Sequence, residues 1–514
     1  MNNCWRLMLW ASVTGCVAPL AWSAEALDVG GRKQLFIDAK YVEQAEGVRW
    51  QVNPPVKTGF VLAGTHDWEN GLIFGASTVM EDQGKYRLWY TACPVPPGKV
   101  RNETYHGFFL CYAESDDGTH WRKPELGLYE WNGSWANNIL MKVPMEVGGG
   151  IFVDPTAPLE QRYKLIGRLY GYQDERFPDS RGTGPEGTGV YAYTSPDGLR
   201  WAFQPRRLYP FEADAINMAF YDAEQARYLA YIRTRIDKTR RSVGVIATTD
   251  LHQPWSYQPE LPGRIPLALA PSKDDPLDID YYCPAVVKYP WADDAYLMFA
   301  SVYRHFPRPA MGTYVDDGRK YHNDGLLDVT LAASRDGLRF KRVSREPYVP
   351  LGLAGARDSS QIYMTVGMIR HGNEVLQYYG GLDYTHGMDI ALPEMKQRGG
   401  LMQVRQRLDG FVSLEAEAAG GQFTTPPLAF EGQRLALNLD VAVEGEIRVE
   451  LRDEEGRPLE GFGFADCQPI MGNDLARVVT WKYGTSDLSR LSATPVRVAF
   501  KLRLAKLYAF QFVP

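Results

Sequence analysis

A tight turn of one kind recurs along the chain, and its spacing constrains the fold more than any other feature of the sequence. The pattern is Ser-x-Asp-Gly with an aromatic residue three positions after the glycine; close copies are 115–121, 195–201 and 334–340, and looser ones are 249–255 and 408–411. Each copy ends a group of three strand-like segments, the first apolar, the second aromatic-rich and the third made of small residues. Repeats of roughly 40–80 residues that contain only strands are typical of radial blades, because each unit buries its face against its neighbours. The sequence therefore predicts an all-β fold, a five-bladed β-propeller, with an axial funnel as the expected functional site.

The repeat ends near residue 410, and the sequence then changes character. Residues 446–452 and 496–500 alternate polar and apolar side chains, which is the pattern of half-buried strands in a β-sandwich. We therefore expect three parts: residues 1–24 as a signal peptide, 27–410 as the propeller and 411–514 as a C-terminal β-sandwich accessory domain.

The first 24 residues have the composition of an export signal. Arg6 precedes an apolar stretch from 7 to 20, and small residues follow up to Ala24, as in a secretory signal that is cleaved. We expect a secreted or periplasmic protein. Cys16, which follows Val-Thr-Gly, leaves a second alternative open, a lipidated lipoprotein. Only in that alternative do we expect contact with a membrane.

The spacing of the cysteines and the net charge limit the kinds of ligand and partner that this chain is expected to bind. Of the 6 cysteines, Cys4 and Cys16 fall in the signal, and the remaining four have no CxxC or His-linked metal spacing. Cys93 and Cys111 lie on neighbouring predicted strands, so that either a disulfide or two buried thiols would suit the pattern. A net charge of −6 argues against nucleic acid as a partner. With 12% aromatic residues, which stack on sugar rings, the expected partner is carbohydrate.

Long polar loops join the second and third strands of each unit, at the end of the funnel opposite the turns at Asp82, Asp154 and Asp222. Loops of more than roughly 12 residues in a compact fold are usually functional or disordered. These loops and the adjacent strand ends bring Arg, His and aromatic side chains to one mouth, a composition that suits a polyhydroxylated ligand. The predicted substrate-binding residues are Trp68, Asn217, Arg233, Tyr282, Arg304, His305 and His386.

Acidic residues near the starts of the inner strands supply the predicted catalytic groups. Their distances from the far-end turns place Asp214 and Asp280 at the top of inner strands, and Glu69 and Asp358 in loops that fold over the mouth. Glycosidic cleavage needs one protonated carboxyl group and one ionised carboxylate. Crowding of like charges raises the pKa of one group of such a pair. Asp214 is the leading candidate.

No cofactor is expected, with calcium as the single alternative left open. Asp274, Asp275, Asp278 and Asp280 lie close in sequence, and oxygen ligands suit that ion. Because this segment lacks a recognisable calcium-loop signature, a solvated turn is the favoured interpretation. We therefore predict no metal-binding residues.

Several short motifs give the chain a resemblance to a known superfamily; they lie at 85–90, 117–128, 137–139, 154–164, 217–233, 407–414 and 506–512. In them the chain resembles the five-bladed propeller glycosidases, the superfamily that includes glycoside hydrolase families 32, 43, 62 and 68. It is most similar to bacterial secreted family-32-like proteins with a C-terminal β-sandwich. The resemblance implies hydrolysis of a glycosidic bond in the funnel by three acids from different blades. The superfamily's first-blade aspartate would fall near Phe74, so that Glu69 or Asp67 would have to take its place.

Together these patterns predict a secreted glycoside hydrolase that cleaves a poly- or oligosaccharide with paired carboxylates. Two alternatives stay open: a glycan-binding propeller without catalysis, and a polysaccharide lyase in which His386 or Tyr282 acts as the base. The surroundings of the acids discriminate among them. A separation of roughly 5–9.5 Å between two carboxyl groups permits glycosidase chemistry, whereas acids that are each paired to Arg indicate binding alone. The sequence leaves the sugar, the linkage and the oligomeric state open.

Overall fold

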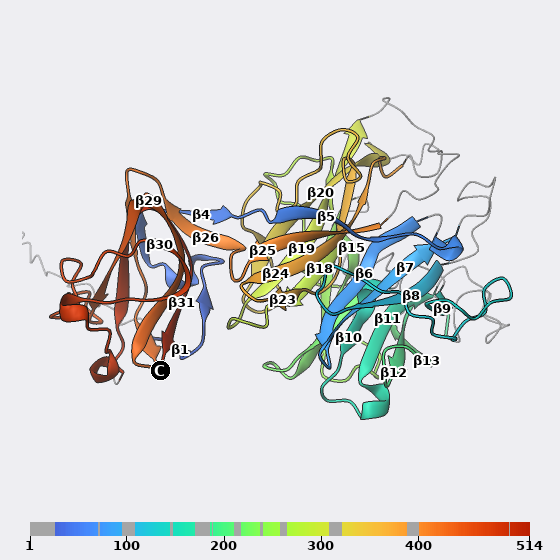
Figure 1. Ribbon diagram of the computed structural model, residues 1–514, viewed down its shortest axis with the longest axis horizontal. Coiled ribbons are helices and arrows are strands. Elements are labelled where there is room, and N and C mark those ends of the chain that lie inside the picture. The colour runs from blue at the N-terminus through green and yellow to red at the C-terminus, as the bar shows by residue number, and fades with distance from the viewer. Residues whose placement is uncertain are drawn as a thin grey trace, which may run out of the picture.

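The computed structural model describes residues 26–514 apart from 70–71, 95–107, 144–147, 170–185, 188, 210–216, 237–239, 257–264, 308–320, 388–399 and 493. The described part consists of strands joined by turns and short 3-10 helices (Figure 1). The 3-10 helices are η1 (Ala39–Tyr41), η2 (Asp67–Glu69), η4 (Gly148–Gly150), η5 (Leu159–Gln161), η7 (Lys482–Gly484) and η8 (Ser489–Leu491). Within the described part, no helix has the length and apolar character needed to span a bilayer. The predicted signal peptide and Cys16 lie outside the described residues.

Three antiparallel sheets of four strands and one sheet of nine strands make up most of the chain between residues 56 and 407 (Figure 1, right). In the nine-stranded sheet, a parallel pairing of Leu327 with Gln361 joins two groups of antiparallel strands. The first unit consists of β6 (Leu72–Asp82), β7 (Lys85–Cys93), β8 (Phe108–Ser115) and β9 (Ile139–Val143). The second consists of β10 (Ile151–Val153), β11 (Tyr163–Leu169), β12 (Gly189–Ser195) and β13 (Ala202–Tyr209). The third consists of β14 (Met218–Asp222), β15 (Arg227–Arg235), β16 (Arg241–Thr248) and β17 (Leu267–Leu269). The fourth unit is β18 (Ile279–Lys288), β19 (Tyr296–Pro307), β20 (Tyr321–Ser334) and β21 (Lys341–Arg342). The fifth is β22 (Gln361–Met364), β24 (Glu374–Leu382), β25 (Gly400–Arg407) and β5 (Val56–Ala63), with β23 (Ile369–His371) beside β24. We refer to these five groups of strands as the first to the fifth unit.

The ring of units closes between the fifth and the first. Strand β5 comes before the first unit in the chain, yet it pairs with β25 as the outermost strand of the fifth. Thr78 of the first unit forms a parallel bridge with Val366 of the fifth. The Tyr378 hydroxyl of the fifth unit donates to the carbonyl oxygen of Gly118 in the first, at 2.6 Å. A closed ring of radial sheets is a β-propeller, so the predicted all-β propeller is confirmed, while the number of five blades stays a prediction.

The Ser-x-Asp-Gly turn joins neighbouring units. In the copy at 195–201, the Ser195 hydroxyl oxygen accepts from the backbone N–H of Gly198 at 2.9 Å, and the Asp197 carboxylate accepts from those of Leu199 and Arg200. The Gly198 carbonyl oxygen then accepts from the indole N–H of Trp89, in the preceding unit, at 2.7 Å. Tyr231 and Tyr378 make the same contact to the turns of the units that follow them in the ring. The turns that predict the blades in the sequence therefore also form the contacts that hold neighbouring units together.

We expect a Gly198→Ala substitution to destabilise the fold by more than backbone strain alone. Gly198 has φ +75°, and an added Cβ would lie 2.7 Å from Trp89 Cζ2. Gly84 is the matched control, because its φ is +74° and an added Cβ would meet nothing within 4 Å. Positive φ costs a non-glycine residue about 1–2 kcal/mol, and overpacking adds about 1–3 kcal/mol. Denaturant unfolding of the two variants measures the difference, and equal losses of stability would contradict this account.

A second contact joins the units at the far end of the funnel. The carboxylates of Asp82, Asp154 and Asp222 each accept a hydrogen bond from a tyrosine hydroxyl of the next unit, namely Tyr163, Tyr228 and Tyr296. Asp222 also accepts from the ammonium group of Lys288 at 2.8 Å. Burial opposes the ionisation of Asp222, but the hydrogen bonds from Lys288 and Tyr296 outweigh it, so that the pKa of this carboxyl group is below its ordinary value of 3.8.

The lowered pKa of Asp222 predicts a loss of stability in acid. A carboxyl group whose pKa is lower in the folded state stabilises the fold above its unfolded pKa, and this contribution disappears as the pH falls through the folded pKa. We expect Asp222→Asn to lower the thermal midpoint at pH 6. The gap from the wild type should close as the pH falls below about 3.8. Thermal melts of both proteins from pH 6 downward measure this, and a gap that is independent of pH would refute it.

A β-sandwich follows the propeller (Figure 1, left). Its strands from the C-terminal part of the chain are β26 (Val412–Ala416), β27 (Gly421–Thr424), β28 (Leu428–Phe430), β29 (Arg434–Arg452), β30 (Gly472–Val478) and β31 (Arg497–Val513). Their inward side chains form one hydrophobic core that includes Phe423, Phe500 and Phe510. The change of pattern after residue 410 thus marks the start of this module.

The start of the chain differs from the predicted domain range. The sequence places residues 27–52 in the propeller, but β1 (Leu27–Gly30), β2 (Gln34–Leu35), β3 (Gln44–Glu46) and β4 (Arg49–Val52) pair with β28, β31, β27 and β26. Phe36 and Tyr41 pack into the core of the sandwich. These short strands bury their apolar side chains against partners more than 350 residues away in the numbering, which local patterning does not reveal.

Cys93 and Cys111 are both buried, and no disulfide joins them. They lie on adjacent strands, but the register of β7 and β8 places Tyr90, and not Cys93, opposite Cys111. Of the two alternatives that the sequence leaves open, the structure therefore contains two buried thiols and not a disulfide between them.

Candidate active site

The side chains of four residues, Asp280, Tyr282, Tyr303 and His305, share one face of the fourth unit. Asp280 pairs with Tyr303 across β18 and β19. Because side chains alternate along a strand, Tyr282 and His305 lie on the same face as these two. After Tyr282 the strand contains a bulge, where Cys283 has φ +46°. Bulges redirect the neighbouring side chains, and here the bulge lies directly beside Tyr282.

Asp280 is buried, with 2% of its surface exposed. Its carboxylate accepts from the backbone N–H of Arg241 at 2.9 Å, from the Arg241 guanidinium at 2.7 Å, and contacts Nε2 of His305 at 2.8 Å. Burial alone would raise the pKa of Asp280, but the hydrogen bond from His305 and the charge of Arg241 hold it below the ordinary value. Asp280 is therefore an ionised carboxylate at neutral pH.

Arg241 joins Asp280 to the surrounding rings. Its guanidinium also donates to the Asn323 side-chain oxygen at 2.7 Å, and lies 5.3 Å from the ring centre of Tyr282 and 5.5 Å from that of Tyr303. Among the described residues, no acceptor lies within hydrogen-bonding distance of its buried Nε atom. Arg241 thus keeps an unused donor inside an aromatic cluster.

The fifth unit completes this cluster. The His386 ring contacts those of Tyr303 and Tyr282, with ring centres 4.8 Å and 5.7 Å apart. The Tyr363 hydroxyl lies 3.1 Å from His386 Nδ1 and donates to the Gln361 side-chain oxygen at 2.7 Å. We call Arg241, Asp280, Tyr282, Tyr303, His305, Tyr363 and His386 the mouth cluster. It brings together side chains from the third, fourth and fifth units.

Glu69 lies elsewhere, in η2 of the first unit, and its side chain is buried. One carboxylate oxygen accepts from the backbone N–H groups of Thr65 and His66 and from the Lys123 ammonium group at 2.7 Å, and the other accepts from the Tyr90 hydroxyl. Four donors, one of which is the charged Lys123 ammonium group, anchor this carboxylate within the first unit. Its contacts therefore hold a turn together and do not extend to the mouth cluster.

Trp68, next to Glu69, is part of the same anchored turn. Its indole N–H donates to the Asn138 side-chain oxygen at 3.0 Å, and its ring stacks on that of His66 with ring centres 4.4 Å apart. Only 9% of Trp68 is exposed, which leaves little of its ring surface available to a sugar.

Asp358 is buried in the turn before β22. Its carboxylate accepts from the Lys57 ammonium group of β5 at 2.5 Å and from the Tyr379 hydroxyl at 2.9 Å. This ion pair joins the strand β5 to the rest of the fifth unit. All three described acids of the predicted catalytic set, Glu69, Asp280 and Asp358, are therefore paired with cations.

The other predicted residues have varied surroundings. Asp214, the leading catalytic candidate, lies outside the described residues. Asn217, just before β14, is buried and accepts a hydrogen bond from the Tyr209 hydroxyl at 3.3 Å. Arg233 lies on β15 and is partly buried. Arg304 is 57% exposed and pairs with Asp278 at 2.6 Å.

A raised carboxyl pKa is found away from the mouth cluster. Burial raises the pKa of Asp328, on β20, to about 6. Asp328 pairs in register with Val302, whereas the neighbouring position, Leu327, pairs with Tyr303. Since alternate side chains point to opposite faces, Asp328 faces away from Asp280 and does not form a pair with it.

Three of the four aspartates considered for calcium pair with different cations in the structure. Asp275 pairs with Arg342 and Arg345, Asp278 with Arg304, and Asp280 with Arg241. Among the described residues, no group of three His, Cys, Asp or Glu side chains is arranged to hold a metal ion.

Several residues of the mouth cluster and its surroundings are absent from the prediction. They are Tyr303, Tyr363, Gln361 and Asn323. A signal for one of them exists in the sequence, because Tyr303 lies two residues before the predicted His305 on a strand whose side chains alternate. The contribution of Asn323 depends on the fold of the chain and has no such signal.

Comparisons with known proteins find solved structures that resemble this chain at low similarity. No family model matches the chain, and no curated protein does. A solved structure called a glycoside hydrolase has a TM-score of 0.44, with 16% identity over 70% of this chain and 93% of its own. A Bombyx mori GH32 β-fructofuranosidase has a TM-score of 0.41 and 10% identity, and the match covers 90% of this chain and 95% of its own. An F. plautii N-acetylgalactosamine deacetylase has a TM-score of 0.43 and 12% identity, and the match covers 70% of this chain and 96% of its own. Values this low transfer no reaction to this chain.

Proposed function

We propose that the protein is a carbohydrate-active enzyme, a secreted or periplasmic glycoside hydrolase whose substrate binds at the mouth cluster. The observation that carries the proposal is the buried Asp280–Arg241 pair inside a ring of Tyr and His side chains. The rings of Tyr363 and His386 are partly exposed, and such aromatic faces suit the apolar faces of sugar rings. Pockets with convergent polar groups among aromatic side chains are typical ligand sites.

The chemistry needs one proton donor and one ionised group. Asp280 is held ionised by Arg241 and His305, so it suits the role of an anion that stabilises positive charge on the sugar. We assign the proton donor to Asp214, on the approach to the inner strand of the third unit, the unit that also supplies Arg241. Glu69 and Asp358 are assigned structural roles, because Lys123 and Lys57 neutralise them within their own units.

The test is a panel of purified glycans incubated with the full-length protein. Separation of the products by size, with analysis of their anomeric configuration, detects hydrolysis and its stereochemistry. We expect reducing sugar to appear with at least one glycan. An unsaturated sugar among the products would instead identify a polysaccharide lyase, with His386 or Tyr282 as the base.

A second candidate function is a non-catalytic glycan-binding propeller. The pairing of every described candidate acid with a cation favours it, because such carboxylates are not available for proton transfer. Binding to a glycan that is recovered intact after long incubation would support this candidate and exclude hydrolysis as the function.

A further inference from the structure

The β-sandwich contains a groove that the proposed function does not use. Its floor is the outward face of the sheet formed by β3, β27, β31 and β29, where Gln422, Lys501 and Arg448 lie in register on three adjacent strands. Two hollows of about 270 Å³ and 430 Å³ lie along this face and share Glu46 and Gln422 in their linings. Ligand sites are typically about 300–1,000 Å³. We call the two hollows together the sandwich groove.

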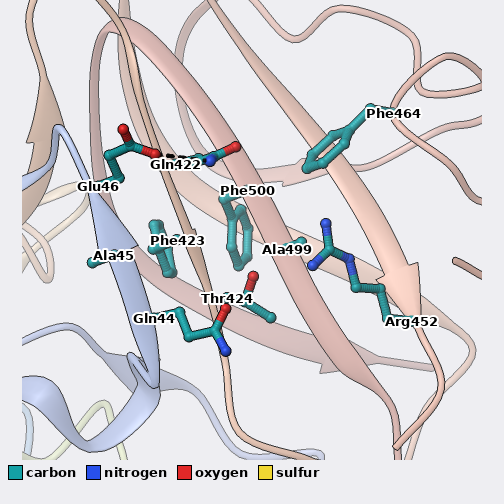
Figure 2. Close-up of a pocket in the computed structure, with 10 residues that line it drawn as sticks. All are labelled: Gln44, Ala45, Glu46, Gln422, Phe423, Thr424, Arg452, Phe464, Ala499 and Phe500. Atoms are coloured by element: carbon teal, nitrogen blue, oxygen red, sulfur yellow. Dashed lines mark hydrogen bonds between the residues drawn. The ribbon is translucent and has the colours of Figure 1, made fainter. Parts of the chain in front are cut away.

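Small residues create the space, and polar side chains line it. Ala499 lies in register between Thr424 and Glu450, where a larger side chain would fill the first hollow. Gln44 and Glu46 border it on one side and Arg452 and Phe464 on the other, above the core residues Phe423 and Phe500 (Figure 2). Side-chain amides, a guanidinium and a ring are groups that bind sugar hydroxyls and sugar faces.

Phe464 is fixed in place as one wall of this groove. Its backbone N–H donates to the Glu450 carboxylate at 3.1 Å, and its carbonyl oxygen accepts from Arg448 at 3.4 Å. Its ring is partly exposed and lies 4.5 Å from the ammonium group of Lys501 and 6.0 Å from the guanidinium of Arg452. These hydrogen bonds hold the backbone of Phe464 in place, and its ring is part of the lining of the groove.

The charges of the groove favour an anionic ligand. Four cations line it, Arg448, Arg452, Lys501 and Arg503, against two carboxylates, Glu46 and Glu446, although the whole chain has a net charge of −6.

The cations of the groove differ in how they are paired. Arg448 and Arg503 pair with Glu446, and Arg452 pairs with Glu450. Lys501 is exposed, and no carboxylate of the described residues lies within ion-pair distance of it. A ligand anion would therefore meet an uncompensated positive charge at Lys501.

We propose that the sandwich groove binds an acidic oligosaccharide, one whose sugars carry carboxylate or sulfate groups. The anionic group binds at Lys501 and a sugar ring packs against Phe464. This inference rests on the proposed function only in that both sites take glycans. The groove would hold the same polymer at a position separate from the mouth cluster.

Affinity electrophoresis of the full-length protein tests this inference. The probes are polygalacturonate and dextran sulfate, with methyl-esterified pectin and dextran as their uncharged counterparts. We expect at least one anionic polymer to retard the protein far more than its uncharged counterpart does. Phe464→Ala and Lys501→Glu should each weaken that binding by roughly tenfold or more. Thermal melts show whether Phe464→Ala remains folded, and the surface variant Lys501→Glu serves if it does not.

Lys482→Glu is the matched control. Lys482 is also exposed and also lies over an aromatic ring, that of Tyr483 at 5.4 Å, but it does not line the groove. We expect this variant to bind like the wild type. If Lys482→Glu and Lys501→Glu weaken binding equally, the loss of binding comes from the net charge of the whole protein, and the proposal is overturned. Absence of retardation by either anionic polymer would overturn it as well.

An Asp214→Asn variant separates the two sites. It should keep its retardation by the anionic polymer, because its change lies in the propeller. If Asp214→Asn abolishes retardation while the groove variants retain it, the proposed function stands and the groove proposal fails. If the groove variants lose retardation and no glycan of the panel is cleaved, the groove proposal stands and the proposed hydrolysis fails.

Discussion

Asp214→Asn is expected to lower the rate of glycan hydrolysis by roughly 10²–10⁴-fold, the usual contribution of a general acid. The amide cannot deliver a proton to the leaving oxygen, yet it has nearly the same shape as the carboxyl group. The thermal midpoint should therefore stay close to that of the wild type. The measurement is kcat/KM on the best substrate of the glycan panel, together with a thermal melt of each protein.

Glu212→Gln is the matched control, because Glu212 lies two residues from Asp214 and the substitution removes the same charge. We expect this variant to keep most of its activity. A fully active Asp214→Asn protein would remove Asp214 from the proposed mechanism. Loss of activity in both variants would show that the charge of the segment matters, and not a proton from Asp214.

Asp280→Ala is expected to destabilise the protein by about 3–5 kcal/mol, the usual cost of removing one partner of a buried ion pair. The side chains of Arg241 and Asp280 are only 7% and 3% exposed. The substitution therefore leaves a buried guanidinium without its counter-charge and takes a partner from His305. Denaturant unfolding monitored by tryptophan fluorescence measures the change in the free energy of unfolding.

The double variant Asp280→Ala, Arg241→Met tests whether the unpaired charge causes this loss. Methionine fills much of the space of arginine without the charge, so that the double variant should be more stable than Asp280→Ala alone. If the single and double variants are equally unstable, the loss comes from packing, and the ion pair is not its cause. Both should lack hydrolytic activity if the mouth cluster is the site.

The propeller could be predicted from the sequence because its signal is local. Each Ser-x-Asp-Gly turn is encoded in a few consecutive residues, and the same residues contact the neighbouring unit. The placement of residues 27–52 was wrong because their partners, such as β31, lie at the other end of the chain. No short-range pattern distinguishes a strand that pairs with the next segment from one that pairs with a distant segment.

The candidate site could be predicted in part. Counting along the inner strands located Asp280, and it lies with Tyr282, His305 and His386 in one cluster. The count could not show which cation each acid meets. Lys123 and Lys57 reach Glu69 and Asp358 from other strands, and such pairing depends on three-dimensional packing. The placement of Asp214 stays a prediction.

The path of the N-terminal segment has a consequence for how the protein can be made and divided. Residues 27–52 complete the sandwich, and β5, directly after them, completes the last propeller unit by pairing with β25. Neither module can finish folding until synthesis has passed the distant strands that it pairs with, so assembly must wait for long-range contacts, which form slowly. Cutting the gene at residue 410 would give one fragment with orphaned leading strands and another with exposed sheet edges. A two-part expression of this protein should therefore carry residues 27–52 with the C-terminal fragment.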